Sequence, residues 1–559
     1  MFKRIFSIVM ILGVFALAFG SAAPSRAQEG DPPVEAIVTL ARVADIFLGA
    51  SSSSPSHLAA YNGALYFGAN GNDGAGNELW KYDPANGAAR VADIYTGSTS
   101  SSPNYLTVYN NALYFNATGD GGAGIELWKY DPINGAQIAA DINISLFSNP
   151  AFLTVYDNAL YFGADGGEGA GRELWKYDPV NGAQRVADIN SGALGSYPSY
   201  LAAYNNGLYF SADGGDGKGT ELWKYDAANG AQLVADIYSG NMASAPSDLT
   251  VYKKALYFSA RGDDGAGWEL WKYDPANGVQ RVADIYTGIG DSFPRYMAVY
   301  NGALYFCANG NDGAGWELWK YDPVNGAQLV TDIWSGSGAS SPSYMTAYSG
   351  ALYFSANGND GTGIELWKYD TTTIATLRSS QGYDGWTLES AENTNAGGTM
   401  NSSAATFMVG DNAQDKQYRS VLSFDTSSIP DNAVIISVKL KIRYQGLAGT
   451  NPFGTHGALV VDVRKGSFGS AALQLNDFQS TASKSAIGTI PNSPVANWYT
   501  KTWASGVFAY INKSGITQFR LRFAADDNND NGADYLKFYS GNTATLSLRP
   551  LLEIGYYIP

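Results

Sequence analysis

The triplet Glu-Leu-Trp recurs seven times along this chain, and its spacing limits the possible folds more than any other feature. It begins at Glu78, Glu126, Glu173, Glu221, Glu269, Glu317 and Glu365, at intervals of 47 or 48 residues. Each repeat holds four short runs typical of β-strands, separated by tight turns and one Gly-rich loop. Four strands in a period of about 40–50 residues are typical of a β-propeller blade. The sequence therefore predicts an all-β protein whose residues 37–370 form a seven-bladed propeller.

The two ends of the repeat predict how this ring closes. A strand-like fragment, residues 42–46, precedes the first complete hairpin, whereas the seventh repeat ends at Asp370 without the equivalent strand. If a link such as residues 95–104 runs from the outermost strand of one blade to the innermost strand of the next, the N-terminal fragment completes the seventh blade. If the Gly-rich loop makes this crossing, a C-terminal strand completes the first blade. Either arrangement predicts a strand-swapped closure.

Composition narrows the class of protein and its partners. Hydrophobic residues make up 45% of the chain and charged residues 15%, so a disordered polyelectrolyte is excluded. The net charge is −16, and residues 1–370 hold 20 Lys and Arg against 37 Asp and Glu, so the acidity lies in the repeats. Nucleic acid and anionic membranes are poor partners for such a surface. The single cysteine, Cys307, excludes an internal disulfide.

The first 27 residues have the layout of a secretory signal. Lys3 and Arg4 precede an apolar run over residues 5–20, and small residues follow up to Ala27. We expect cleavage after Ala27 and a protein that is secreted or displayed at the cell surface. The apolar run is shorter than the ~20 residues that a membrane span needs, and no later stretch is apolar enough to span a bilayer.

Residues 375–559 lack the repeat but keep strand patterns. Apolar residues alternate over residues 434–444, and shorter strand-like runs cover residues 458–464, 519–523 and 535–539. This pattern predicts a second all-β domain, a jelly-roll β-sandwich.

Both parts resemble known bacterial families. The segment Tyr-Asn-Asn-Ala-Leu-Tyr-Phe at residues 109–115, followed by Glu-Leu-Trp-Lys-Tyr-Asp-Pro at 126–132, resembles a Kelch-type blade and, more closely, the secreted proteins with Glu-Leu-Trp (ELW) repeats. The run at 419–430 and the closing Arg-Pro-Leu-Leu-Glu-Ile at 549–554 resemble the DNRLRE-type domain. Such domains are jelly-roll sandwiches of secreted proteins, and some bind polysaccharide.

Residues that recur in every repeat are expected to serve the framework. The Trp and Glu of the triplet and the Asp of Tyr-Asp occur in all seven units. A side chain needed equally by every blade suits packing between blades and turn formation better than recognition of one ligand.

One slot, just after the link between blades, holds a set of aromatic side chains. We consider as ligand-binding candidates Tyr105, Phe152, Tyr200, Tyr296 and Tyr344; His57 and Asp248 occupy the same slot in the other two repeats. Aromatic rings on a rim can stack on the apolar C–H face of a sugar. The alternative is that each ring only plugs the top of its blade.

An acidic loop in the second domain is the candidate metal site. Asp527, Asn529 and Asn531 alternate before a glycine, as in the first half of an EF-hand loop, and Asp534 follows closely. The pattern predicts a Ca²⁺ site. Phe538 stands where the bidentate glutamate would be, so a solvated acidic turn is the alternative.

Catalytic signals are weak. The chain has two histidines, too few for a His-based zinc site, and it lacks a Gly-x-Ser-x-Gly elbow and a phosphate loop. The main departures from the repeat are Lys253, Lys254, Asp248, Arg261, Arg295 and Cys307. The sequence therefore favours a non-catalytic binding or adhesion protein for polysaccharide at the cell surface or in the environment. The alternatives are a polysaccharide lyase or glycosidase with a cleft in blades five and six, and a protein-interaction scaffold.

Overall fold

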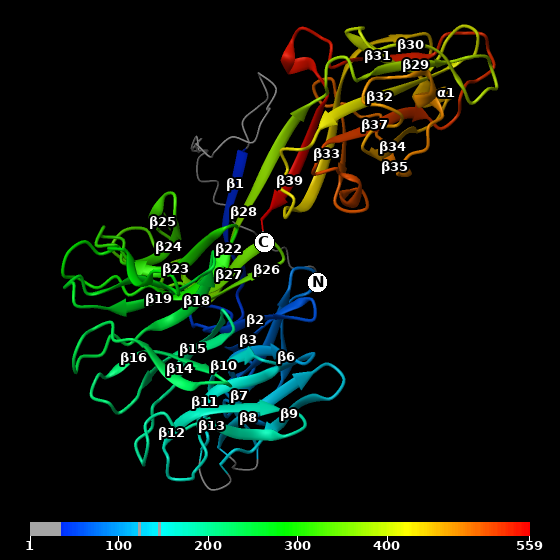
Figure 1. The fold of residues 1–559 in the computed structure, drawn as a ribbon. Coiled ribbons are helices and arrows are strands. Elements are labelled where there is room, and N and C mark those ends of the chain that lie inside the picture. The colour runs from blue at the N-terminus through cyan, green and yellow to red at the C-terminus, as the bar shows by residue number, and fades with distance from the viewer. Residues whose placement is uncertain (1–34, 121–123, 144–146, 559) are drawn as a thin grey trace. The chain divides into compact units, whose positions relative to one another are not determined.

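The computed structural model describes residues 35–120, 124–143 and 147–558, and these residues are nearly all strand, turn or loop (Figure 1). The predicted signal peptide, residues 1–27, lies outside the described residues. The described helical elements are α1 (Pro452–Thr455) and the 3₁₀ turns η1 (Leu475–Phe478), η2 (Phe508–Tyr510) and η3 (Leu546–Leu548). The prediction of an all-β protein is confirmed. The chain divides into two compact units, one over Thr39–Asp370 and one from Thr371 onward.

The first unit contains a propeller-like ring of blades, six of which are separate four-stranded antiparallel sheets. Their strands, blade by blade, are β2 (Ser56–Tyr61), β3 (Ala64–Asn70), β4 (Asn77–Asp83), β5 (Gly87–Ala92); β6 (Asn104–Tyr109), β7 (Ala112–Thr118), β8 (Ile125–Asp131), β9 (Gly135–Ala140); β10 (Ala151–Tyr156), β11 (Ala159–Asp165), β12 (Arg172–Asp178), β13 (Gly182–Ala187); β14 (Ser199–Tyr204), β15 (Gly207–Asp213), β16 (Thr220–Asp226), β17 (Gly230–Ala235); β18 (Ser247–Tyr252), β19 (Ala255–Arg261), β20 (Trp268–Asp274), β21 (Gly278–Ala283); β22 (Arg295–Tyr300), β23 (Ala303–Asn309), β24 (Trp316–Asp322), β25 (Gly326–Thr331).

The seventh repeat is organised differently from the other six. It supplies β26 (Ser343–Tyr348), β27 (Ala351–Asn357) and the first part of β28 (Ile364–Arg378), and β1 (Glu35–Ala44) also pairs with β28. The later part of β28, residues 373–378, lies in the second unit and pairs there with β39, so β28 is part of a larger sheet. The structure therefore has six separate blade sheets where the sequence predicted seven. The pairing of β1 with β28 corresponds to the first of the two predicted closures.

The triplet glutamates fasten each blade to the link that follows it. In the first blade, Glu78 is fully buried and accepts hydrogen bonds from the N–H groups of Ile94 and Ser101 and from the Ser101 hydroxyl, at 2.7–2.8 Å. Glu365 makes the same three contacts with Ile46 and Ser53 from the start of the chain. Burial raises the pKa of these carboxyls, and their hydrogen bonds oppose the rise.

The other recurring residues also serve the framework, as predicted. Asp83 accepts the N–H groups of Ala85 and Asn86 and the Asn86 side chain, an Asx turn that shapes the hairpin from β4 to β5. Trp80 packs in the apolar cluster that also holds Ile46 and Phe67. The equivalent tryptophans of the other repeats are buried in the same manner or partly buried against the same kind of cluster.

The second unit is a sheet that curls around one apolar core. Its further strands are β29 (Gly385–Glu389), β30 (Gly397–Asn401), β31 (Thr406–Asp411), β32 (Gln417–Asp425), β33 (Val434–Ala448), β34 (Leu459–Lys465), β35 (Lys484–Ile490), β36 (Trp498–Trp503), β37 (Ile516–Phe523), β38 (Tyr535–Tyr539) and β39 (Leu551–Tyr557). The long strand β33 produces the curl, because its first part pairs with β39 and β36 and its last part with β38. Fully buried Phe407, Leu440 and Phe519 lie in the enclosed core.

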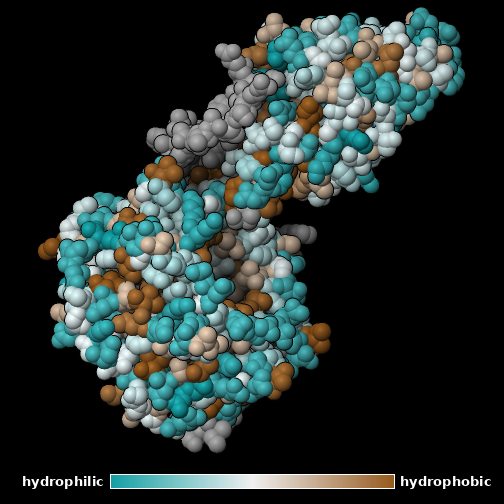
Figure 2. Space-filling view, viewed as in Figure 1, coloured by the Kyte–Doolittle hydropathy of each residue, from teal (hydrophilic) through white to brown (hydrophobic). Residues whose placement is uncertain are grey.

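The viewed surface is mainly hydrophilic, with hydrophobic residues scattered in small groups (Figure 2). Within the described residues, no helix is long and apolar enough to cross a membrane. No large apolar patch dominates the face seen in Figure 2.

Candidate functional site

A β-bulge at the start of each innermost strand creates the candidate site. In β14, for example, Ser199 pairs with Ser211 and Ala202 pairs with Tyr209, so the register shifts between them. The second residue of every innermost strand has a positive φ, between 52° and 59°, which is unusual for bulky residues. A bulge redirects the side chain of the residue that it contains. These residues are His57, Tyr105, Phe152, Tyr200, Asp248, Tyr296 and Tyr344, the slot found in the sequence.

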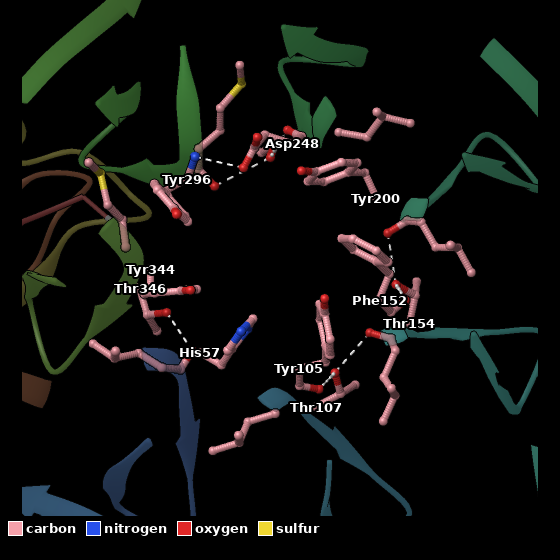
Figure 3. Close-up of a pocket in the computed structure, with 18 residues that line it drawn as sticks. His57, Tyr105, Thr107, Phe152, Thr154, Tyr200, Asp248, Tyr296, Tyr344 and Thr346 are labelled. Atoms are coloured by element: carbon pink, nitrogen blue, oxygen red, sulfur yellow. Dashed lines mark hydrogen bonds between the residues drawn. The ribbon is translucent and has the colours of Figure 1, made fainter. Parts of the chain in front are cut away.

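The bulges direct these seven side chains into one central ring (Figure 3). Neighbouring ring centroids lie 4.4–4.8 Å apart, and successive ring planes are tilted by 47–53°, close to one seventh of a full turn. Asp248 occupies the remaining place, and its Oδ1 accepts the N–H of Tyr296 at 2.7 Å. The candidate residues therefore surround a central opening and contact one another.

The ring lines a pocket of about 270 Å³. The hydroxyl ends of Tyr105, Tyr200 and Tyr344 point toward the opening (Figure 3). The residues after the ring positions complete the lining; they are Leu58, Leu106, Leu153, Leu201, Leu249, Met297 and Met345. Thr107 donates a hydrogen bond to the carbonyl of Leu153 in the next blade, at 2.9 Å, and Thr346 does the same to Leu58, at 2.8 Å. The Leu and Met side chains are buried in the apolar clusters between blades, so the pocket presents aromatic rings and hydroxyl groups on a cross-linked scaffold.

Burial sets the protonation states in this pocket. It lowers the pKa of His57 to about 4, so the imidazole is neutral at pH 7. It raises the pKa of Asp248 to about 6, although the Tyr296 N–H and the nearby Arg295 charge oppose the rise. It also raises the pKa of Tyr200 to about 12, so the phenol keeps its proton. At neutral pH the ring therefore presents one carboxylate among uncharged donors and acceptors.

The departures from the repeat do not all belong to this site. Lys253 and Lys254 form the tight turn after β18, at the opposite end of that strand from Asp248. Arg261 lies over the ring of Tyr238, 5.3 Å from its centroid. Arg295 directly precedes the ring residue Tyr296 and pairs across the sheet with the buried Cys307. The predicted group in blades five and six therefore separates, and Asp248 and Arg295 remain at the pocket.

Sequence reasoning missed three aromatic residues near Arg295. Trp268 and Trp316 start the third strands of two adjacent blades, and Phe293 lies in the link between those blades. A tryptophan precedes Glu-Leu-Trp in only two of the seven repeats, and this was the available signal.

The acidic loop of the second unit uses its side chains for internal hydrogen bonds. Asp527 Oδ1 accepts the N–H and the side-chain amide of Asn529, at 3.1 and 2.8 Å. Asp534 Oδ1 accepts the N–H of Thr450 at 2.6 Å, and Asn531 donates its N–H to Asp415 at 3.0 Å. In the described part of the chain, no group of three or more His, Cys, Asp or Glu residues is arranged to hold a metal ion. Calcium binding by Asp527, Asn529, Asn531 and Asp534 stays a prediction.

Comparisons with known proteins give no family for this chain. No family model matches it, and no curated protein matches it. Among solved structures, a puromycin hydrolase is 12% identical over 68% of this chain, with a TM-score of 0.40, and this chain covers 60% of the hydrolase. An exo-β-1,3-galactanase variant from Phanerochaete chrysosporium with β-1,3-galactotriose is 11% identical over 92% of this chain and 99% of its own, with a TM-score of 0.27. With such scores the fold assignment rests on the strands described above.

Proposed function

We propose that this chain is an exported, non-catalytic binding or adhesion protein whose central ring recognises polysaccharide at the cell surface or in the environment. The ring of aromatic, hydroxyl and carboxylate side chains around one pocket carries the proposal. A sugar offers hydroxyl groups that need both donors and acceptors, and its C–H faces pack against aromatic edges and apolar side chains. Aromatic rings, hydroxyl groups and one carboxylate surround the opening shown in Figure 3.

The charge content of the pocket supports binding over hydrolysis. Hydrolysis of a glycosidic bond by the common mechanism uses two carboxyl groups about 5 to 9.5 Å apart. Among the described residues that line the pocket, Asp248 is the sole carboxylate. The pocket volume is close to the lower end of the ~300–1,000 Å³ range of ligand sites, which suits one or two sugar residues of a chain.

We also propose that β26, β27, β28 and β1 act as the seventh blade of a closed ring. Three sets of hydrogen bonds that join successive blades recur between the last repeat and the first: Glu365 with Ser53, Thr346 with Leu58, and the Tyr348 hydroxyl with the carbonyl of Gly63 at 2.6 Å. The second unit is proposed as a jelly-roll module of the carbohydrate-binding type, and the N-terminal signal as the export device.

Affinity electrophoresis tests the proposal. The mature protein is run through gels cast with a panel of neutral and acidic polysaccharides, with calcium or with chelator, and each gel is also inspected for clearing. Retardation without clearing is the expected result. Clearing would identify an enzyme, and migration unaffected by every polysaccharide would contradict the proposal and direct the search to protein partners. Loss of retardation with chelator would support the predicted calcium loop, and a parallel titration of an Asp534→Asn variant would assign the effect to it.

A further inference from the structure

The seven repeats provide an internal control for residues that the fold does not require. The position before Glu-Leu-Trp holds Asn77, Ile125, Arg172, Thr220, Trp268, Trp316 and Ile364. The position before the link proline holds Ser54, Ser102, Asn149, Tyr197, Ala245, Phe293 and Ser341. The six separate blades have equivalent strands whatever occupies these positions. The folding of blades five and six therefore does not explain why Trp268, Phe293 and Trp316 occur together.

These three aromatic residues form a continuous row. The centroids of Trp268 and Phe293 lie 5.4 Å apart with ring planes 23° from parallel, and those of Phe293 and Trp316 lie 6.1 Å apart at 31°. All three side chains are partly exposed. Trp316 also packs against the buried apolar cluster that holds Tyr300, whereas Trp268 and Phe293 belong to no such cluster. Partly exposed aromatic faces that lie side by side are typical of sites that bind flat or ring-shaped ligands.

Arg295 extends this row toward the central pocket. Its guanidinium carbon lies 4.7 Å from the ring centroid of Trp316 and 5.2 Å from that of Phe293. The next residue, Tyr296, belongs to the ring and donates its N–H to Asp248. The row and the pocket are therefore adjacent parts of one surface.

The guanidinium of Arg295 has no hydrogen-bond partner among the residues that the structure describes, and its charge acts on the nearby Asp248 carboxylate. Arg172, in another blade, donates to the carbonyls of Asn149 and Gly163, at 2.7 and 2.6 Å. Arg295, by contrast, is exposed and makes neither an ion pair nor a hydrogen bond with the residues that the structure describes. An arginine held on aromatic rings, with its N–H groups free, is suited to pair with a carboxylate in two-point geometry.

We propose that Trp268, Phe293, Trp316 and Arg295 form a subsite for an acidic sugar residue, a uronate, of the polysaccharide that enters the central pocket. The rings supply the apolar contact surface and Arg295 pairs with the uronate carboxylate. This inference rests on the proposed function. Because the repeats are acidic overall, they repel a polyanion everywhere except near Arg295. The binding of a polyanion therefore depends on Arg295 more strongly than it would if the repeats carried no net charge.

The repeats also supply the test variants. Arg295→Ser installs the residue found at this position in four other repeats, and Trp268→Thr with Trp316→Thr installs the residue of Thr220. Arg261→Asn is the matched control, because Arg261 also lies over an aromatic ring and asparagine occupies its position in three repeats. The probes are polygalacturonate and a neutral glucan of similar length in affinity gels. Titration with galacturonate oligomers, followed by tryptophan fluorescence, is the second measurement.

The wild-type protein is expected to bind polygalacturonate, with at least a tenfold higher dissociation constant for Arg295→Ser and no change for Arg261→Asn. Uronate oligomers should alter the tryptophan fluorescence of the wild type but not of the variant that combines Trp268→Thr with Trp316→Thr. Binding of both polymers that is unaffected by Arg295→Ser would overturn this inference while leaving the proposed function intact. Failure of polygalacturonate to bind the wild type would also overturn it, whereas the wider panel decides the proposed function separately.

Discussion

Replacement of Glu365 by alanine tests whether the start and end of the repeat region are joined as the other blades are. Glu365 Oε1 accepts the Ser53 N–H at 2.9 Å, and Oε2 accepts the Ile46 N–H at 2.9 Å and the Ser53 hydroxyl at 2.6 Å. Glu221 makes the same contacts between two successive repeats, with Ile237 and Ser244 at 2.5–2.8 Å. The two carboxyls differ mainly in sequence separation, which is over 300 residues for Glu365 and about 20 for Glu221.

The expected cost follows from these contacts. Either alanine variant leaves two backbone N–H groups and one hydroxyl without their acceptor in a fully buried site. An unsatisfied buried group costs about 1–3 kcal/mol, so the three groups together give an expected loss of about 3–9 kcal/mol in the free energy of unfolding of each variant. Urea unfolding of the mature protein, followed by tryptophan fluorescence, measures both losses.

Equal losses for the two variants would show that the last repeat is closed onto the first as firmly as any internal pair of blades. A loss below about 1 kcal/mol for Glu365→Ala, beside a full loss for Glu221→Ala, would refute the closure by β1.

Three further predictions concern stability. Burial raises the folded-state pKa of the triplet glutamates, that of Glu269 from 4.5 to about 7, so the folded state binds their protons more tightly than the unfolded state. The melting temperature should therefore rise as the pH falls from 7 toward 4.5. A melting temperature that falls steadily over this range would contradict the prediction. Gly71→Ala places a Cβ 2.0 Å from the indole of Trp80. Its free energy of unfolding, measured in urea, should be about 1–3 kcal/mol lower than that of the wild type. Asp462→Ala leaves the buried Arg520 guanidinium without its 2.9 Å partner; calorimetry should show a loss of about 3–5 kcal/mol, and an unchanged transition would count against a structural role for the pair.

The fold could largely be predicted because the same pattern of strands and turns occurs in seven consecutive repeats. In the second unit, the strands predicted at residues 458–464 and 535–539 correspond within one residue to β34 (Leu459–Lys465) and β38 (Tyr535–Tyr539). The larger sheet that contains β28 could not be predicted, since the pairing of one strand with two neighbours at different places depends on tertiary contacts rather than on local pattern.

The candidate site could be predicted in its residues but not in its geometry. The slot that holds Tyr105 and Tyr200 was visible as a column of aromatic side chains, whereas the bulge that turns them inward comes from a register shift that no residue type marks. The row formed by Trp268, Phe293 and Trp316 was missed, because single departures from a repeat resemble drift until they are found side by side.

Two sets of three tyrosines on the same strands, β6, β14 and β26, test the central claim. The ring variant has phenylalanine in place of Tyr105, Tyr200 and Tyr344. The second variant has phenylalanine four positions later, in place of Tyr109, Tyr204 and Tyr348, whose hydroxyls donate hydrogen bonds to carbonyls of the next blade. Phe152 already occupies the ring, so the first set preserves the fold.

Calorimetric titration with oligosaccharides of the retarding polysaccharide, together with thermal melting, gives the answer. Sugar binding in the central pocket predicts at least a tenfold loss of affinity with an unchanged melting temperature for the ring variant. It predicts a lower melting temperature with unchanged affinity for the second variant. A ring variant that binds as tightly as the wild type would contradict the account.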